Sequence, residues 1–451
     1  MSFRSIVKKA IPIGLFERIE PMGHLIEAIA ANIRYGFPSK SMHVIGVTGT
    51  NGKTTTSFMI HKMLSKAGLK VGLLTTVAYG VNDDIHPQIA HMTTVSAPLL
   101  QKRLAEFKAQ GVEWVVLETT SHALVQHRVW GVPYEIAVMT NITHEHLDYH
   151  KTFARYVAAK RRLFQIAARH GMRLGIVNAD DEHAATFLSA TPNSLAYGIK
   201  TGELTANDIS LTAEGSEYTA EVGGDSYAIR CRIPGEFNVY NSLAAVAVGR
   251  KIGLSKQQIE DGIKSLEGVE GRMTVIDEGQ PFGVIIDYAH TPDSFEKLLH
   301  DLRPVVKGKL VVVFGSAGRR DEEKRAVQGE IAAKYADEVV LTEEDDRDID
   351  GQEIMDEIAL GAEKVGKTRE RDLFLVHDRR EAIIFAFSRV SKKEDTVILL
   401  GKGHEKDILR PGPRAAELRH LKQDDGDPER VISVPWSEAE EARKALQALA
   451  K

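Results

Sequence analysis

Cysteine is nearly absent from this chain, and several other features that mark particular classes of protein are absent as well. Cys231 is the only cysteine among 451 residues, which excludes an intrachain disulfide and a multi-cysteine zinc site. No apolar run approaches the roughly 18 residues that a membrane span needs. Residues 1–14 are basic but have no sustained apolar core or cleavage site, which argues against a signal peptide. These absences favour a protein of a reducing cytoplasm.

Charge of one sign is not in excess either. The chain has 58 Lys and Arg against 63 Asp and Glu, which gives a formal net charge of −5. Nucleic-acid-binding proteins usually carry a basic excess, and no polybasic block here points to a membrane surface. With 43% hydrophobic residues, the composition is that of an ordinary globular protein, and the length predicts two or three domains.

The stretch GVTGTNGKTTT, which begins at Gly46, carries the clearest chemical signal. It follows an apolar run and precedes a helix-compatible segment, which is the layout of a phosphate-binding loop. Gly49 and Gly52 let backbone N–H groups approach an anion, and a helix N-terminus adds about half a positive charge. Lys53 can reach the outer phosphates of a nucleotide, and the Thr54 hydroxyl can ligate Mg²⁺. Because the glycine spacing departs from the standard loop, a lysine in an ordinary glycine turn is the alternative.

Apolar runs alternate with helical segments in two blocks. Runs that are continuous rather than alternating are typical of strands buried in a parallel sheet. Between about 207 and 233 polar and apolar residues alternate instead, which predicts a small antiparallel sheet. The expected strands lie at 71–77, 114–118, 135–141 and 174–180 in the first block, and at 283–289, 309–315, 338–344, 373–378 and 395–401 in the second.

This pattern predicts an α/β protein. We expect a helical lead-in over 1–41 and a central ATP-binding domain over 42–271, with a mostly parallel sheet plus the small antiparallel sheet. A Rossmann-like domain follows over 272–451. A helix is expected at 21–35, and the polar region 410–430 is expected to be a surface loop.

Acidic and imidazole side chains gather after two of the predicted strands. Glu118 ends one strand, and since ligands bind at the carboxyl ends of strands in open α/β sheets, it can face the Mg²⁺ held by Thr54. A solvated loop glutamate is the alternative. The segment TNITHEHLDYH follows another strand, and its carboxylates suit Mg²⁺ while its imidazoles suit zinc. Beside a nucleotide loop we favour Mg²⁺, with His146 as a ligand, although the spacing also permits zinc or a structural histidine.

Lys160 occupies an unusual place for a charged residue. In TFARYVAAKRRLF, helical spacing places Lys160 on one apolar stripe with Phe153, Val157 and Phe164. Such a lysine either extends its amine to solvent or is held for a chemical purpose. Burial lowers the pKa of an amine from about 10.4. A neutral amine can add CO₂ and become a carbamate, an anion able to bridge metal ions.

The second block has anion-binding features of its own. Asp287 and His290 follow a strand in DYAHTPDS, and the glycine turn FGSAGRRDEEKR leads basic residues into a helix. The segment GKGHEKD, which begins at Gly401, follows the last strand of the block.

Taken in order, these motifs resemble those of the Mur ligase family, and most closely its MurE type, the UDP-N-acetylmuramoyl-dipeptide:diamino-acid ligases of peptidoglycan synthesis. The resemblance implies that ATP phosphorylates a peptide carboxylate to an acyl phosphate, that an amine attacks it, and that ADP and phosphate leave. It runs from about residue 42 to 409 and rests on GVTGTNGKTTT, LETTSHAL, TNITHEHLDYH, YVAAKRRLF, GEFNVYNSLAA, Gly271-Arg272, DYAHTPD, FGSAGRRDEEKR and GKGHE.

The resemblance also implies roles for individual residues. Lys53 and two Mg²⁺ ions would stabilise charge on the transferring phosphoryl group. Thr54 and Glu118 would bind one ion, and His146 with carbamylated Lys160 would bind the other, so Lys53, Lys160 and His146 are the expected catalytic residues. Asn241 would contact adenine, and the other expected ATP contacts are Gly49, Thr50, Asn51, Gly52, Lys53, Thr54, Thr55, Arg272 and Asp287. The expected muramoyl-peptide contacts are Thr93, Thr94, Thr120, Gln126 and Arg128, and the expected amino-acid contacts are Arg347, Gly401 and Glu405.

Three departures from the MurE pattern bear on the substrate. About 40 residues precede the loop, too few for the N-terminal domain with which MurE proteins grip the uridine nucleotide. We therefore expect the UDP end to be held loosely, to be held by a partner, or to be absent. The usual acceptor motif Asp-Asn-Pro-Arg appears as Glu344-Asp345-Asp346-Arg347. Its arginine can pair with the distal carboxylate of diaminopimelate, which favours that acceptor over lysine. Thr120 replaces a serine and keeps the hydroxyl.

We therefore expect a monomeric, ATP- and Mg²⁺-dependent ligase of the cytoplasm that joins small molecules, adding a diamino acid to a muramoyl-dipeptide. One alternative is a synthetase for another acid, such as poly-γ-glutamate, folate or an amino-acid polymer. The expected lack of the first domain favours that alternative, while the muramoyl-peptide positions count against it. A second alternative is a nucleotide-binding subunit without ligation activity, which the set Lys53, Glu118, His146 and Lys160 disfavours.

Overall fold

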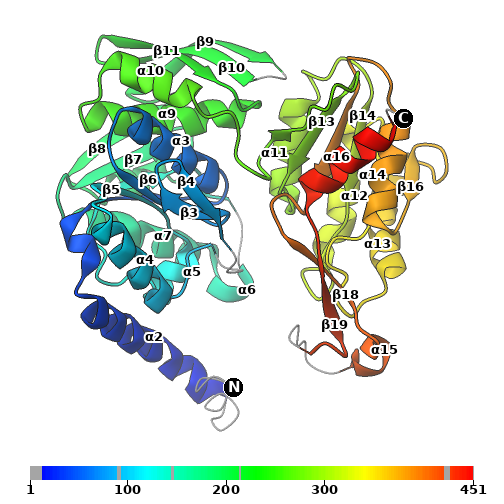
Figure 1. Ribbon diagram of the computed structural model, residues 1–451, viewed down its shortest axis with the longest axis horizontal. Helices are drawn as coiled ribbons and strands as arrows, with labels where there is room; N and C mark the ends of the chain where they lie inside the picture. Colours follow the sequence, from blue (N-terminus) through cyan, green and yellow to red (C-terminus); the bar gives the residue numbers. More distant parts are fainter. Residues whose placement is uncertain (1–12, 89–92, 144–146, 213–214, 421–426, 450–451) are drawn as a thin grey trace. The chain divides into compact units, whose positions relative to one another are not determined.

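The computed structural model describes residues 13–88, 93–143, 147–212, 215–420 and 427–449. The chain folds into two compact units (Figure 1). The first comprises 1–210, 216–232 and 237–266, and the second comprises 211–215, 233–236 and 267–451. Every helix in the described part of the chain is too short or too polar to cross a bilayer.

A large sheet forms the framework of the first unit. Within the described residues it has 11 strands in the order β11-β10-β9-β8-β7-β6-β1-β5-β2-β3-β4. Pairing is parallel from β2 through β5, β1, β6, β7 and β8 to β9, whereas β2–β3, β3–β4 and β10–β11 are antiparallel. The strands are β1 (His43–Thr48), β2 (Val71–Leu74), β3 (Ala78–Val81), β4 (Asp84–Pro87), β5 (Trp114–Glu118), β6 (Tyr134–Met139), β7 (Leu174–Asn178), β8 (Asn193–Gly198), β9 (Leu204–Thr212), β10 (Gly215–Val222) and β11 (Asp225–Cys231).

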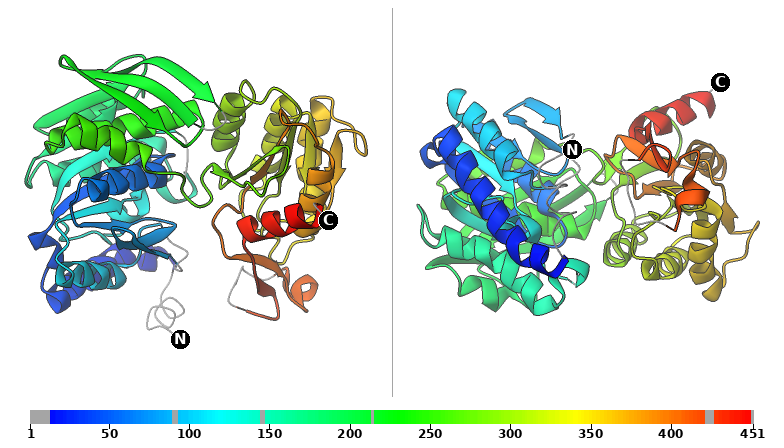
Figure 2. Two further views of the ribbon diagram at one scale, coloured as in Figure 1. Left: turned by 45° about the horizontal axis from the view of Figure 1, so that its top comes forward. Right: turned by 90° about the horizontal axis from the view of Figure 1, so that it is seen from below.

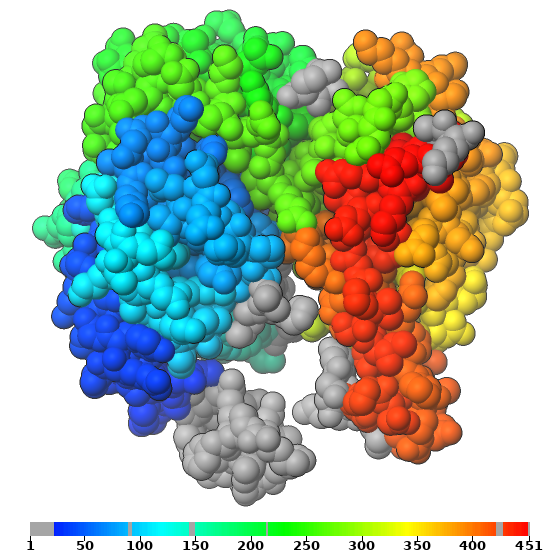
Figure 3. All heavy atoms as spheres, in the orientation of Figure 1, coloured from blue at the N-terminus to red at the C-terminus, as the bar shows by residue number. Residues whose placement is uncertain are grey.

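Helices cover both faces of this sheet. Figure 1 shows α4 (Ala97–Ala109), α5 (Ser121–Val125) and α7 (Phe153–Ala167) on one side, and α3 (Lys53–Lys66), α9 (Glu236–Lys251) and α10 (Lys256–Lys264) on the other. Leu104 and Phe164 from the first group share a core with Val44, Leu117 and Met139 of the strands. The remaining helical segments are α2 (Ile13–Tyr35), η1 (Pro38–Ser41), α6 (Leu147–His150) and α8 (Ala184–Leu188). Helix α2 packs against α4 and lies at the surface of the unit (Figures 2 and 3).

The second unit is a smaller doubly wound sheet. Its order is β12-β13-β17-β14-β15-β16, and all pairs except β12–β13 are parallel. The strands are β12 (Thr274–Val275), β13 (Gly283–Asp287), β14 (Leu310–Phe314), β15 (Glu338–Leu341), β16 (Leu373–Leu375) and β17 (Thr396–Leu400), with a separate hairpin of β18 (Asp407–Pro411) and β19 (Val431–Pro435). The helices are α11 (Pro292–Leu302), α12 (Glu323–Tyr335), α13 (Gly351–Lys364), α14 (Arg379–Ser388), α15 (Ala415–Leu418) and α16 (Glu438–Leu449).

The predicted fold class is confirmed, and so are the expected strands. Their continuous apolar runs are buried along their whole length in β7, β14 and β17, as expected for strands covered on both faces. The antiparallel region 207–233 is also present, but it continues the large sheet, because β9 pairs with β8.

The helix expected at 21–35 is present, because α2 spans Ile13–Tyr35. One local prediction was wrong. The region 410–430 is not a plain loop, because it contains the end of β18 and the short helix α15. Ile408, which is fully buried, anchors β18 beneath the second core, and β19 supplies its antiparallel partner.

Candidate functional site

The turn between β1 and α3 has the geometry of a phosphate-binding loop. Gly49 (φ 155°) and Gly52 (φ 79°) adopt backbone conformations that other residues rarely take. A Cβ atom at Gly49 would lie 1.8 Å from Thr140 Oγ1, and one at Gly52 would lie 2.3 Å from Asn241 Oδ1. The first turn of α3 then presents N–H groups that have no intrahelical partner. The loop is therefore a close-fitting cradle whose donors suit an anion.

Lys53 bends back over this loop. Its amine donates to the carbonyl oxygens of Thr50 (2.7 Å) and Gly49 (3.1 Å). The loop is also braced from outside, because Thr50 N donates to Asn141 O (2.7 Å) and Thr50 Oγ1 lies 3.0 Å from the hydroxyl of Tyr156. Lys53 is thus held above the cradle, where its charge can meet a phosphate.

Thr54 and Glu118 meet at the carboxyl end of the parallel strands, as the prediction of a shared metal ion requires. Thr54 Oγ1 donates to Glu118 Oε2 at 3.0 Å, and both side chains are buried. Thr76 holds the same carboxylate through its N–H (2.9 Å) and its hydroxyl (3.0 Å). Thr55 lies beside Thr54 in the first turn of α3 and is also buried. Glu118 is therefore not a solvated loop residue, and hydroxyl and carboxylate oxygens form a donor set that suits Mg²⁺.

Lys160 is buried, with 2% of its surface exposed, as its position on the apolar stripe of α7 predicts. Its amine donates to the carbonyl oxygen of Gly49 and lies 4.6 Å from the centre of the Tyr156 ring. The amine therefore does not extend to solvent. The amines of Lys53 and Lys160 converge on one loop carbonyl, that of Gly49.

Asn241 lies directly beside the loop. Its Oδ1 accepts a hydrogen bond from Thr56 Oγ1 (3.1 Å), and its Nδ2 donates to Asn238 Oδ1 (2.8 Å). These bonds fix the side chain of α9 against the start of α3. The adenine contact of Asn241 remains a prediction.

Two residues that the sequence reasoning did not single out shape the loop. Thr140 Oγ1 and Asn141 Nδ2 donate to Asn51 O at 2.6 and 3.1 Å, and Asn141 Oδ1 accepts from Asn51 N at 2.9 Å. Both begin the segment TNITHEH, so their signal lay in the same motif as the predicted ligand. His146 lies outside the described residues.

The predicted peptide-binding residues form one connected group in the first unit. The Thr94 hydroxyl lies 3.3 Å from that of Thr120 and donates to Glu118 O at 3.0 Å. Arg128 donates to Thr94 O at 2.7 Å and to Gln126 Oε1 at 2.9 and 2.5 Å. Because Thr94 bonds the backbone of Glu118, this group lies next to the contact between Thr54 and Glu118. Thr93 precedes it and is half-buried.

Ring side chains border this group. Gln126 Nε2 donates to the hydroxyl of Tyr149 (3.3 Å), and the Tyr149 ring lies 4.3 Å from that of His122 and 5.0 Å from that of His150. His150 Nε2 in turn lies 2.9 Å from Ser121 Oγ. The sequence reasoning had not assigned these rings, although His122 lies in LETTSHAL and His150 in TNITHEHLDYH.

In the second unit, Arg272 and Asp287 lie close together. Asp287 follows the buried strand β13 and accepts hydrogen bonds from Met273 N (2.8 Å) and Ala289 N (2.7 Å). Burial raises the pKa of Asp287, and the charge of Arg272 acts in the opposite direction. The guanidinium of Arg272 lies 4.8 Å from the ring centre of Tyr288, while its Nε is buried and has no hydrogen-bond partner among the described residues. An unpaired buried donor of this kind suits an anionic ligand.

Gly401 and Glu405 belong to a turn built around a fully buried lysine. Lys402 Nζ bonds Glu405 Oε2 at 2.6 Å and Asp345 Oδ1 at 2.9 Å. Glu405 Oε1 also accepts from the hydroxyl of Tyr288 at 3.3 Å. The sequence reasoning did not assign Lys402, because nothing in GKGHE alone shows that its lysine is buried.

Arg347 is embedded in the same region, with 5% of its surface exposed. Its Nη1 donates to Gly318 O at 3.0 Å, and its Nη2 lies 3.8 Å from Asp345 Oδ2. Its backbone is left-handed (φ 56°), and its N–H donates to Leu409 O at 2.9 Å. The arginine thus supports the turn that carries it.

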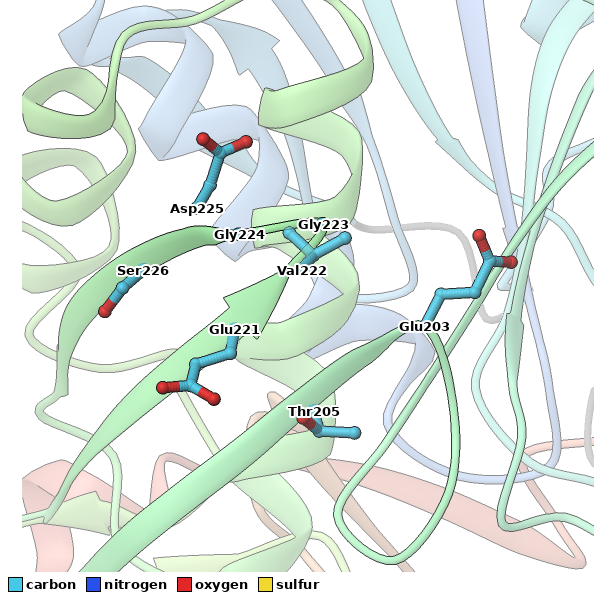
Figure 4. A pocket seen from close by; sticks show the side chains of 8 residues that line it. All are labelled: Glu203, Thr205, Glu221, Val222, Gly223, Gly224, Asp225 and Ser226. Carbon is cyan, nitrogen blue, oxygen red and sulfur yellow. The ribbon is translucent and has the colours of Figure 1, made fainter.

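Two other features in the described residues do not form a site. Glu343, Asp346 and His377 offer metal-binding atoms within 4.8 Å of one another, but Arg410 bonds both carboxylate oxygens of Glu343 (2.5 and 2.8 Å). Figure 4 shows a pocket on the antiparallel strands whose carboxylates point in different directions. Two of them are already engaged, Glu221 by Asn207 and Asp225 by Arg250. The pocket lining is Glu203, Thr205, Glu221, Val222, Gly223, Gly224, Asp225 and Ser226.

A phosphate-type loop at the carboxyl end of a central parallel strand, followed at once by a helix, defines the first unit as a nucleotide-binding domain of the α/β class. Comparison with known families then places the chain. Residues 47–249 match the Mur ligase middle domain, and residues 271–403 match the Mur ligase glutamate ligase domain. The chain belongs to the Mur ligase family, a family of ligases.

Individual relatives support this assignment. The chain is 39% identical over 429 residues to a UDP-N-acetylmuramyl-tripeptide synthetase of Roseiflexus sp. (strain RS-1), covering 92% of this chain and 80% of that protein. It is 39% identical to a UDP-N-acetylmuramoyl-L-alanyl-D-glutamate--2,6-diaminopimelate ligase of Syntrophomonas wolfei, covering 84% and 76%. These relatives are MurE-like ligases that add amino acids in peptidoglycan precursor synthesis, and the predicted family is confirmed.

Solved structures agree. A UDP-N-acetylmuramoyl-L-alanyl-D-glutamate--2,6-diaminopimelate ligase superposes with a TM-score of 0.63 at 31% identity, covering 91% of this chain and 79% of that one. A folylpolyglutamate synthase of Mycobacterium tuberculosis superposes with a TM-score of 0.70 over 84% and 92%. At 18% identity, that second likeness shows the shared fold alone.

Proposed function

We propose that this protein is an ATP- and Mg²⁺-dependent acid–amino-acid ligase that adds a diamino acid to a muramoyl-dipeptide in the cytoplasm. The observation that carries the proposal is the convergence of the Lys53 and Lys160 amines on the cradle of Gly49, beside the contact between Thr54 and Glu118. A nucleotide phosphate fits such a cradle, and the oxygen donors beside it suit Mg²⁺. The names of the MurE-like relatives support the choice of substrates.

Lys53 and the N–H groups at the start of α3 hold the outer phosphates of ATP in this proposal. Their charge lies where negative charge grows as the phosphoryl group moves to the peptide carboxylate. Thr54 and Glu118 hold one Mg²⁺, which supplies Lewis-acid stabilisation of the phosphate oxygens when bound. Asn241 orients the base, and Arg272 and Asp287 are the other predicted contacts of the nucleotide.

Lys160 has a separate role in the proposal. Its neutral amine attacks CO₂, a C–N bond forms, and the nitrogen loses one proton, so the neutral amine becomes a carbamate anion. Burial favours the neutral amine that this step needs. As a carbamate, Lys160 would hold a second Mg²⁺ together with His146. The amine meets the carbonyl of Gly49, so its position supports this role.

The remaining predicted residues bind the two substrates to be joined. Thr94, Thr120 and Arg128 hold the muramoyl-peptide with its carboxylate toward Glu118, to which they are already connected. Thr93 and Gln126 border that peptide. Glu405 and Gly401 receive the amino acid, whose neutral amine attacks the acyl phosphate and releases phosphate.

A product screen tests this function. Purified protein is incubated with ATP, Mg²⁺, one muramoyl-peptide and one amino acid. Each muramoyl-peptide is tried with and without UDP, and each is combined with every amino acid of the panel. The masses of the products are then measured by mass spectrometry. We expect an amide whose mass equals peptide plus amino acid minus water, formed together with ADP and phosphate. Ligation only to folate or to polyglutamate would replace the proposed acid. ATP turnover without any amide product would leave a nucleotide-binding protein that does not ligate.

A further inference from the structure

The three most exposed large hydrophobic side chains among the described residues all lie on helix α2. They are Met22 (64%), Ile26 (65%) and Ile33 (66%). Helical spacing places them on one side of α2 together with Ala30, which is also exposed. We call these four residues the α2 strip. A contiguous apolar surface of this kind marks a place that another molecule covers.

The opposite side of α2 is fixed to the first unit. Ala28 and Ala31 are buried there, and α2 packs against α4. Asn32 is fully buried and donates to Trp130 O at 2.8 Å. Figure 2 shows α2 lying along the surface of this unit. The helix is therefore held in place, and it presents the α2 strip outward in one direction.

We propose that the α2 strip binds a second copy of the chain, with the two α2 helices antiparallel and crossing at Ala30. Since an α-helix rises about 1.5 Å per residue, Ile26 lies about 6 Å before Ala30 and Ile33 about 4.5 Å after it. A two-fold axis at Ala30 therefore brings Ile26 against the partner's Ile33, and Ile33 against the partner's Ile26. The small side chain of Ala30 lets the two helices approach closely at the crossing.

The charges beside the α2 strip fit the same axis. Glu27 and Arg34 are exposed, lie along one edge of the strip, and form no ion pair with any described residue. Glu27 lies about 4.5 Å before the crossing and Arg34 about 6 Å after it, so antiparallel packing brings Glu27 beside the partner's Arg34, and the reverse. A parallel pair would instead bring like charges together. One charge of each sign also makes an anionic bilayer, which attracts basic helices, a poorer partner.

Sedimentation velocity of the full chain tests this pairing. Because one helix face is small for an interface, we expect a weak dimer, largely dissociated at about 1 µM and largely associated at about 200 µM. Ile33→Glu places a carboxylate against the partner's Ile26 and Glu27, and it does so twice. It should raise the dissociation constant at least about 30-fold. Leu360→Glu is the matched control, because Leu360 is 62% exposed but lies on α13, and it should leave the dissociation constant unchanged.

Charge reversal tests the antiparallel register without changing the α2 strip. Glu27→Arg alone and Arg34→Glu alone should each weaken self-association, because like charges then meet along the edge of the strip. An equimolar mixture of the two single variants should associate at least as tightly as the wild type, because opposite charges meet again in the mixed dimer. Circular dichroism checks that every variant is folded.

The contradicting results are distinct. A chain that stays monomeric at about 200 µM would overturn the proposal. Binding of that monomer to vesicles containing phosphatidylglycerol would assign the α2 strip to a bilayer instead. A dimer that Ile33→Glu leaves intact would place the contact elsewhere and overturn the proposal. A mixture that associates no more tightly than the single variants would refute the antiparallel register. None of these results bears on the ligase function, which the product screen tests separately.

Discussion

Two loops, one in each unit, carry predicted site residues and are held in different ways. The phosphate-type loop of the first unit is fixed by uncharged groups: Thr140, Asn141 and Tyr156 bond its backbone and its threonine. The turn after β15 in the second unit is fixed by ion pairs, among them those of the buried Lys402 with Asp345 and Glu405. Both are irregular segments at the carboxyl ends of parallel strands, so their position in the fold does not explain the difference.

The charges of the two loops differ as well. The braces of the phosphate-type loop are neutral, so they leave the charge of Lys53 available to an anion such as a phosphate. In the turn after β15 the charges of Lys402 and Asp345 are paired with each other and hold the turn itself. Removal of a lysine beside the phosphate-type loop should therefore lower the activity of the protein. Removal of the lysine that holds the turn after β15 should instead lower its stability.

The largest effect is expected at Lys160. Lys160→Ala removes the amine that meets Gly49 O, and we expect ligation to fall on the order of 10³-fold, because charge stabilisation of the transferring group is lost. Added bicarbonate should not restore activity, since alanine cannot form a carbamate. Initial rates of phosphate release, with circular dichroism as a check of folding, measure this. Full activity in the alanine variant would refute the carbamate.

The opposite behaviour is expected at Lys402. Lys402→Met leaves Asp345 and Glu405 without their buried cation, which should lower the free energy of unfolding by about 3–5 kcal/mol. Lys62→Met is the matched control, because Lys62 pairs at 2.6 Å with an Asp83 that is 83% exposed. The control should change the free energy of unfolding by less than about 1 kcal/mol. Equal effects of the two substitutions in urea titrations would contradict the distinction between the loops.

A smaller effect concerns pH. Burial lowers the pKa of His61, which lies on α3 behind the phosphate loop, from 6.5 to about 4. The folded protein disfavours the protonated form of this imidazole more than the unfolded chain does. The neutral His61 therefore contributes stability that is fully present above pH 6.5 and is lost as the pH falls toward 4. Between pH 7.5 and pH 5 the free energy of unfolding should drop by about 2 kcal/mol on this account. His61→Gln should show a correspondingly smaller drop in urea titrations, and an unchanged drop would refute the role of His61.

The smallest effect separates steric fit from backbone strain. Gly52 and Gly68 both have positive φ (79° and 95°), but only at Gly52 would a Cβ meet a neighbour, Asn241 Oδ1 at 2.3 Å. Gly68→Ala should therefore cost about 1 kcal/mol of stability through strain alone, and Gly52→Ala should cost about 1–2 kcal/mol more. Gly52→Ala should also weaken ATP binding in calorimetry, while Gly68→Ala should not. Equal ATP affinity of the two variants would mean that the cradle does not hold the phosphates.

The two loops also differ in how far the sequence predicts them. The phosphate loop was predictable, because its glycines, Lys53 and Thr54 are adjacent in the chain and their spacing carries the geometry. Burial of Lys160 followed from helical periodicity. The braces Thr140 and Asn141 were missed because they follow a different strand, β6, and reach the loop only in the folded protein. Lys402 was missed for a related reason, because the pairing of a charged residue depends on segments that only the fold brings together.

One measurement tests the central claim most directly: the ratio of phosphate released to amide formed when ATP, a muramoyl-dipeptide and a diamino acid are all present. A ligase that activates the carboxylate at the Lys53 cradle should release one phosphate for each amide. Omitting either the acid or the amino acid should stop both. Phosphate release that continues at the same rate without the amino acid, with no amide formed, would contradict the account.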